Sequence, residues 1–206
     1  MPSRRRLLGL DRSGPRPRAT RRGQPLRPLT IPNLVGYARL AAIPVFLYLA
    51  LRSGDGRTAS ASALYLTIAA SDYLDGFLAR ATGQYSRLGA LLDPTVDRLT
   101  VLAGVVVCWR FELLPRWALA VLAGRELVTL ALAEIALRRG LELEVNWVGR
   151  MSVWLTMGGI FLALVVSGWI APALFLVGLV GSLLALLLYV KAGIADMRHA
   201  ATSTST

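Results

Sequence analysis

Six apolar segments, each of about the length that crosses a bilayer, dominate this sequence of 206 residues. A spanning helix needs about 20 predominantly apolar residues. The chain is 55% hydrophobic, and its mean hydropathy is +0.55. Because lipid cannot satisfy backbone polar groups, only helices or closed barrels span it. Strand-like alternation is absent from the sequence, so we expect an all-α integral membrane protein, a bundle of six transmembrane helices over residues 34–52, 59–79, 88–109, 116–137, 147–168 and 172–195.

Residues 1–29 differ in composition from the rest of the chain. They hold nine arginines and a single acid, Asp11. We expect a disordered arm attracted to anionic lipid, because such a segment has little apolar surface to bury. It lacks the interleaved aromatic residues of a nucleic-acid-binding arm, so we expect no nucleic acid partner. The membrane domain is expected over residues 30–198, with Asn33 as the N-cap of its first helix, and 199–206 form a polar tail.

The basic residues predict the orientation, because arginine and lysine are enriched in short cytoplasmic loops. With the N-terminus in the cytoplasm, that side receives the arm together with Arg80, Arg87, Arg138, Arg139, Arg150, Lys191 and Arg198. The opposite side receives only Arg52, Arg57, Arg110 and Arg116. We therefore expect the N-terminus to be cytoplasmic.

Four of the 12 acidic residues interrupt the second and third apolar segments. Asp72 and Asp75 lie near the end of one, and Asp93 and Asp97 near the start of the next. Ionised groups at this depth are costly unless they face a cavity, a partner or a metal. Spacings of three and four residues place each pair on one helix face. We therefore expect all four carboxylates around one polar cavity that opens to the cytoplasm.

The available side chains restrict the chemistry of this cavity. The chain has one cysteine, Cys108, and one histidine, His199, which excludes a Ser-His-Asp triad and a Cys- or His-rich zinc site. Carboxylate oxygens favour Mg²⁺ or Mn²⁺. Four carboxylates can hold two ions, and a two-metal site clamps a diphosphate and stabilises displacement at phosphorus.

The neighbours of the acids fit a large anionic ligand. Gly76, Ala79 and Gly89 are small enough for a ligand to approach the helix backbone, and Arg80 can offset phosphate charge. Each residue also has a structural interpretation, since small residues in membrane helices often serve packing and Asp75 could pair with Arg80. That interpretation must hold for all four acids at once, so we favour the metal site.

The whole pattern resembles the signature of the CDP-alcohol phosphatidyltransferases, which here comprises Asp72-x2-Asp75-Gly76-x2-Ala79-Arg80-x8-Gly89-x3-Asp93-x3-Asp97. The resemblance covers most of the chain from Thr30 onward. Three further stretches are similar to the phosphatidylglycerophosphate synthases of that family: Ile31-Pro32-Asn33 with Arg39 and Leu40, Arg125-Glu126-Leu127, and residues 145–150.

The resemblance implies a homodimer of six-helix chains that binds CDP-diacylglycerol at the cytoplasmic membrane surface. It assigns the metals to Asp72, Asp75, Asp93 and Asp97, and contacts with CDP-diacylglycerol to Asp72, Gly76, Ala79, Arg80 and Gly89. It makes Asp97 the general base that deprotonates the acceptor hydroxyl. The resulting alkoxide attacks the phosphorus bearing diacylglycerol, and CMP leaves.

Two acceptor alcohols remain open. Glycerol 3-phosphate is the first, its phosphate held by Arg125, Arg150 and Arg39; for Arg39, a salt bridge fits equally well. Gly149 is followed by Arg150-Met151-Ser152-Val153, where such synthases typically carry Lys-x-Lys-Thr after the glycine. Because the second cation of that element is missing, a cardiolipin synthase with phosphatidylglycerol as acceptor remains the alternative.

Two other classes share single features with the chain. A membrane prenyltransferase also binds a diphosphate through paired acids and Mg²⁺, but would need more spans and would lack the Asp-Gly-x2-Ala-Arg element. A cation transporter predicts acids distributed through the bilayer depth, whereas these four cluster on one side. Release of CMP from CDP-diacylglycerol separates the transferase from both.

Overall fold

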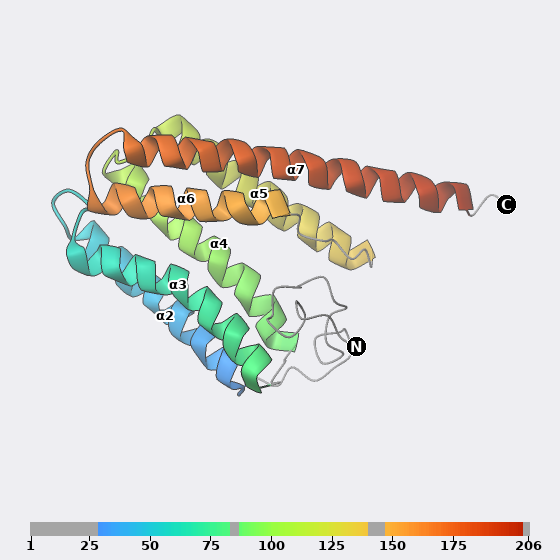
Figure 1. Cartoon of the computed structure of the whole chain (residues 1–206), viewed down its shortest axis with the longest axis horizontal. Helices are drawn as coiled ribbons and strands as arrows, with labels where there is room; N and C mark the ends of the chain where they lie inside the picture. Colours follow the sequence, from blue (N-terminus) through green and yellow to red (C-terminus); the bar gives the residue numbers. More distant parts are fainter. Residues whose placement is uncertain (1–28, 83–86, 140–146, 204–206) are drawn as a thin grey trace, which may run out of the picture.

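The computed structural model describes residues 29–82, 87–139 and 147–203, and the side chains of most of them (Figure 1). Within these ranges the regular elements are all helices, and none is a strand. They are α2 (Ile31–Leu51), α3 (Ala59–Thr82), α4 (Arg87–Arg110), α5 (Arg116–Arg139), α6 (Trp147–Val165) and α7 (Ile170–Ser203). The prediction of an all-α chain is confirmed, with one helix over each of the six apolar segments.

Two helices begin more than one residue earlier than the sequence predicts. Thr30 is the N-cap of α2, so the expected cap at Asn33 is wrong. Pro32 lies in the first turn of α2, where its fixed φ and missing N–H suit a helix start. α7 likewise begins at Ile170 and takes Pro172 into its first turn. Backbone N–H groups in a first turn have no intrahelical partner, so proline breaks no hydrogen bond there.

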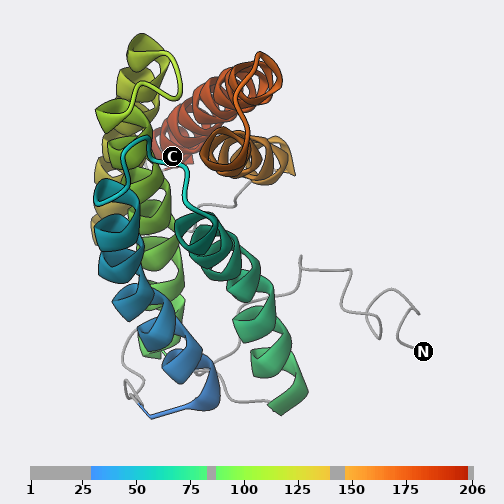
Figure 2. The ribbon, with the colours of Figure 1, turned by 90° about the vertical axis from the view of Figure 1, so that its left-hand side faces the viewer.

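The most extensive helix contacts are between α6 and α7 and between α2 and α3. α6 and α7 lie side by side, and α7 continues past the end of α6 (Figure 1). A Cβ at Gly159 would lie 2.7 Å from Cα of Phe175, and one at Gly178 would lie 2.5 Å from the backbone nitrogen of Thr156. Only glycine allows the two backbones to approach this closely. α2 packs against α3 and α4, and α4 also contacts α5 and α6 (Figure 2).

Among the described side chains, most of the buried apolar core lies at one end of the bundle. Phe46 on α2 and Tyr65 on α3 pack with their ring centroids 5.2 Å apart. Leu119 on α5, Leu164 on α6 and Phe175 on α7 belong to the same cluster. Most of this core comes from the C-terminal halves of α2, α4 and α6 and the N-terminal halves of α3, α5 and α7. On α3 the described core extends as far as Ile68, four residues before Asp72.

Within the part of the chain that the structure describes, two helices are long and apolar enough to cross a membrane, over Asn33–Leu51 in α2 and Ile170–Leu188 in α7. Among the described residues, shorter apolar stretches occur at Ala59–Ser71 in α3 and Met151–Val165 in α6. The six helices are confirmed, but that all six cross a membrane remains a prediction.

Candidate active site on α3 and α4

The acid motif is divided between two neighbouring helices. Asp72 and Asp75 lie in the second half of α3, and Asp93 and Asp97 in the first half of α4. The two helices contact each other and follow one another in the chain. The side chains of Asp72, Asp75 and Asp93 lie outside the described residues, as do the four neighbours Gly76, Ala79, Arg80 and Gly89. Their convergence on one cavity remains a prediction.

Asp97 is the acid of the motif whose side chain the structure describes. Its Oδ1 accepts a hydrogen bond from Nη2 of Arg39 at 2.6 Å, and the two side chains form a salt bridge. Asp97 is 37% exposed, whereas Arg39 is only 3% exposed. The sequence left two roles open for Arg39, a contact with the acceptor phosphate and a salt bridge. The structure shows the salt bridge.

Arg39 also contacts the helix that carries the first two acids. Its Nε donates to the backbone carbonyl of Ile68 on α3 over 3.2 Å. That carbonyl receives a second hydrogen bond, from Oγ of Ser71 at 2.9 Å. Ile68 lies four residues, or about one helical turn, before Asp72. One side chain of α2 thus binds both helices of the acid motif.

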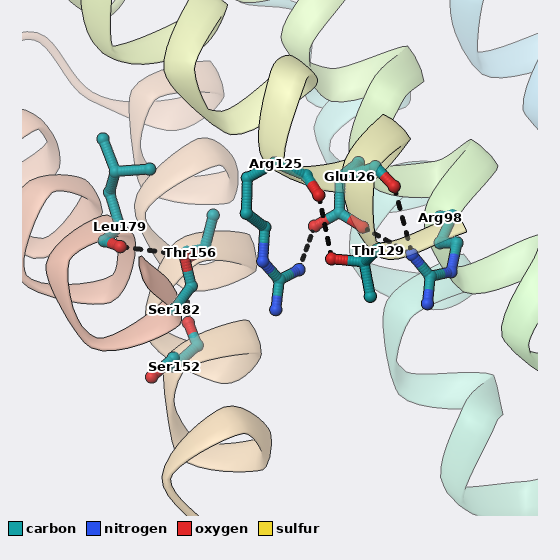
Figure 3. A network of polar contacts seen from close by, with 8 residues as sticks. All are labelled: Arg98, Arg125, Glu126, Thr129, Ser152, Thr156, Leu179 and Ser182. Atoms are coloured by element: carbon teal, nitrogen blue, oxygen red, sulfur yellow. Dashed lines mark hydrogen bonds and ion pairs between the residues drawn. The ribbon is translucent and has the colours of Figure 1, made fainter. Parts of the chain in front are cut away.

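A second charged network joins α4 to α5 (Figure 3). Nη1 of Arg98 lies 3.3 Å from both Oε2 and the backbone carbonyl of Glu126. Nη1 of Arg125 donates to the other carboxylate oxygen, Oε1. Glu126 is 6% exposed, so its carboxylate is buried between two guanidinium groups. The described side chains of Arg98, Arg125 and Glu126 together carry a net charge of about +1, because one anion offsets one of two cations.

A small cavity lies beside Arg125, between α5 and the α6–α7 pair. Its volume is about 10 Å³, and it is lined by Val101, Leu122, Arg125, Glu126, Val153, Thr156 and Ser182. Nε of Arg125 is buried and has no hydrogen-bond partner among the described residues. The hydroxyls of Thr156 and Ser182 donate to the carbonyls of Ser152 and Leu179, each at 2.8 Å, and so retain acceptor capacity (Figure 3).

These contacts bear on the predicted acceptor arginines in different ways. Arg125 is largely buried at this cavity, while the side chain of Arg150, in the first turn of α6, lies outside the described residues. Sequence reasoning missed Arg98 and gave no separate role to Glu126. An arginine within an apolar segment was the available signal for Arg98, because such a cation needs a buried partner. Nothing in the sequence alone identified that partner as Glu126.

No group of three or more possible metal ligands occurs among the described residues. Three of the four predicted ligands, Asp72, Asp75 and Asp93, have side chains outside that part of the chain. The fourth, Asp97, presents a partly exposed carboxylate next to a buried cation. Its oxygen atoms are the donor type that Mg²⁺ and Mn²⁺ prefer.

Known proteins with related sequences include a CMP-forming cardiolipin synthase of Streptomyces coelicolor, 44% identical over 152 residues, which are 70% of this chain and 70% of that protein. A putative cardiolipin synthase of Mycobacterium tuberculosis is 36% identical over 65% of this chain and 63% of its own length. A CDP-diacylglycerol–glycerol-3-phosphate 3-phosphatidyltransferase of Bacillus subtilis is 28% identical over 60% of this chain and 70% of its own. The family model for CDP-alcohol phosphatidyltransferases matches residues 29–196. The chain therefore belongs to the CDP-alcohol phosphatidyltransferase family.

Proposed function

We propose that this membrane-associated enzyme transfers a phosphatidyl group from CDP-diacylglycerol to phosphatidylglycerol, which yields cardiolipin and CMP. The observation that carries the proposal is the environment of Asp97. It is a partly exposed carboxylate, held by a buried arginine, in the half of α4 that carries the family signature. Membership of the family favours this chemistry over a prenyltransferase or a cation transporter.

Members of this family use divalent metal ions. The residues of the motif fit such ions, because they offer only carboxylate oxygens. We assign two Mg²⁺ or Mn²⁺ ions to Asp72, Asp75, Asp93 and Asp97. When bound, the ions would offset the charge of the diphosphate and stabilise the charge that develops on the leaving CMP.

Asp97 would act as the general base. It takes the proton of the acceptor hydroxyl, and the hydroxyl oxygen forms a bond to the phosphorus that bears diacylglycerol. The bond between that phosphorus and the CMP oxygen breaks, and CMP leaves with the electron pair. Gly76, Ala79 and Gly89 would leave room for the nucleotide and diphosphate, and Arg80 would offset part of their charge.

Arg125 and Arg150 would hold the phosphate of the acceptor. Glu126 offsets the charge of one of the two arginines that flank it, Arg98 and Arg125. The small net positive charge suits a phosphodiester, with one negative charge, better than a phosphate monoester, with about −1.5 to −2. The relative of 44% identity named as a cardiolipin synthase supports the same acceptor. Arg39 is engaged by Asp97, which leaves the acceptor phosphate to the other two arginines.

Glycerol 3-phosphate is the second candidate acceptor. The Bacillus subtilis relative, whose name specifies that acceptor, is 28% identical to this chain. The Arg125-Glu126-Leu127 stretch also resembles the synthases that use it. A phosphate monoester would need more cationic contacts than Arg125 provides while it is paired with Glu126.

The membrane arrangement belongs to the same proposal. We infer that residues 30–198 form one domain whose six helices all cross the membrane, and that two copies of the chain form a homodimer. The arginines of residues 1–29, together with Arg80 near the end of α3 and Arg87 at the start of α4, favour the cytoplasm for the N-terminus and the active site. Substrates would then reach Asp97 from the cytoplasmic membrane surface, where lipids and nucleotides meet.

A parallel acceptor assay tests the proposal. Purified protein is given CDP-diacylglycerol and Mg²⁺ with phosphatidylglycerol, glycerol 3-phosphate, inositol phosphate or serine, and both CMP and the lipid product are measured. We expect CMP and cardiolipin with phosphatidylglycerol. Turnover of glycerol 3-phosphate alone would make glycerol 3-phosphate the acceptor in place of phosphatidylglycerol, and no CMP with any acceptor would refute the proposed chemistry.

A further inference from the structure

The deep burial of Arg39 distinguishes it from an arginine that binds substrate. Its guanidinium is almost fully buried, at 3% exposure, whereas the carboxylate that it binds is 37% exposed. A substrate can therefore contact Asp97 without displacing Arg39. Burial of an unpaired guanidinium costs several kcal/mol, so this charge is retained in the interior by its contacts with the protein.

Those contacts connect three helices. Arg39 extends from α2, its Nη2 binds Asp97 on α4, and its Nε binds the Ile68 carbonyl on α3. A guanidinium is planar and donates in fixed directions, so the two bonds restrain the angle between the helices as well as their separation. The bond to α3 is formed one helical turn before Asp72, and the bond to α4 is formed with a motif acid itself.

We propose that Arg39 is a positioning residue for phosphatidyl transfer. It holds the Asp97 carboxylate in the orientation needed to accept a proton and bind metal, and it sets the placement of α3 against α4. The proposal rests on the role of Asp97 in the proposed function. Its physical basis is that a shift of about 1 Å in a reacting group can reduce a rate about 100-fold.

Steady-state kinetics separate positioning from acceptor binding. For Arg39→Gln we expect kcat to fall about 100-fold, with KM for either substrate changed by less than about threefold. Arg39→Lys should recover part of kcat, because it keeps the charge beside Asp97 but loses the fixed two-direction geometry. Arg116→Gln is the matched control, since Arg116 is 55% exposed and pairs with the exposed Glu112. Its kcat should equal that of the wild type.

A double-mutant comparison tests whether Arg39 acts through Asp97. If it does, Arg39→Gln added to Asp97→Asn should lower the residual rate by less than about twofold. A further large loss in the double variant would show that Arg39 affects catalysis by another route, and would overturn the proposal.

A spectroscopic measurement follows the helix placement without any turnover. Spin labels at Leu66→Cys on α3 and Leu99→Cys on α4 occupy positions 47% and 38% exposed, whereas the native Cys108 is 0% exposed and inaccessible to the label. Dipolar EPR should give a shifted or broader distance distribution in Arg39→Gln than in Arg116→Gln. If Arg39→Gln does not fold, Arg39→Lys is measured instead and should show a smaller change in the same direction.

Two further results would overturn the inference. An unchanged distance distribution with unchanged kcat would leave Arg39 without a positioning role. A raised acceptor KM with normal kcat would make Arg39 an acceptor contact. Failure of the proposed function would give a different result. Asp97→Asn would then transfer the phosphatidyl group at the wild-type rate, while Arg39→Gln still shifts the EPR distances.

Discussion

Glu126 on α5 forms a salt bridge with Arg98 on α4, with 3.3 Å between the nitrogen and the oxygen. Arg98 is the residue that follows Asp97, and the other oxygen of Glu126 binds Arg125. The helix of the proposed general base is thereby linked to the helix of the proposed acceptor arginine through one buried carboxylate. Changes at this carboxylate should therefore affect both the fold and the acceptor site.

Glu126→Gln should destabilise the folded protein strongly. The substitution removes the buried carboxylate that both Arg98 and Arg125 bind, and breaking a buried ion pair costs about 3–5 kcal/mol. Glu112→Gln is the matched control, because Glu112 and Arg116 are 70% and 55% exposed and such pairs contribute about 1 kcal/mol or less. Denaturation midpoints of both variants in the same detergent provide the comparison. Equal midpoints would mean that the buried network does not stabilise the fold.

Gly178→Ala should disturb the α6–α7 pair. The added Cβ would lie 2.5 Å from the backbone nitrogen of Thr156, so one helix must move. Overpacking of this kind typically costs about 1–3 kcal/mol. Gly124→Ala on α5 is the control, because its Cβ would meet nothing within 4 Å and alanine favours a helix by about 0.5–1 kcal/mol. Thermal unfolding should show a lower midpoint for the first variant alone, and similar midpoints would argue against the close packing.

Arg125→Gln should raise the acceptor KM and leave the KM for CDP-diacylglycerol nearly unchanged. Loss of a charged contact to a phosphate monoester would cost about 2–5 kcal/mol, and the cost should be smaller for a phosphodiester with large apolar contacts. Arg110→Gln, on the exposed end of α4, serves as the control. Steady-state assays with each acceptor measure the difference. An unchanged acceptor KM would remove Arg125 from the acceptor site while leaving the reaction itself intact.

Deletion of residues 1–26 should leave catalysis intact and weaken association with anionic membranes. Each arginine near such a surface contributes about 1 kcal/mol of attraction, and that attraction is screened by salt. Binding to vesicles with and without anionic lipid, together with CMP release, tests both parts. Loss of CMP release from truncated protein that is still inserted would contradict the prediction.

Much of the helical architecture was predictable from local patterns. Apolar segments of spanning length predicted all six helices, because lipid-compatible segments must satisfy their own backbone hydrogen bonds. The helix starts were less accurate, since α2 and α7 begin before the expected positions 34 and 172 and include Pro32 and Pro172 in first turns that tolerate proline. The predicted polar cavity depends on where side chains point, and the six-span topology depends on the surrounding membrane. Neither follows from the positions of the helices alone.

The contacts of the arginines could be predicted only in part. Burial in an apolar segment indicates that Arg39 and Arg98 need partners. The identity of each partner depends on how α2, α4 and α5 are placed in space, and residues 58 and 28 positions apart in the sequence form the pairs. Separations of this size leave no periodic signal in a single sequence.

The most direct test of the central claim is CMP release from CDP-diacylglycerol by purified wild-type protein and by Asp97→Asn, with Mg²⁺ and phosphatidylglycerol present. Removal of a general base typically lowers a rate by about 10²–10⁴, and the loss of a metal ligand adds to that effect. We predict cardiolipin and stoichiometric CMP from the wild type, and a rate lower by at least about 100-fold from a folded Asp97→Asn variant. Turnover by folded Asp97→Asn at the wild-type rate would contradict the account.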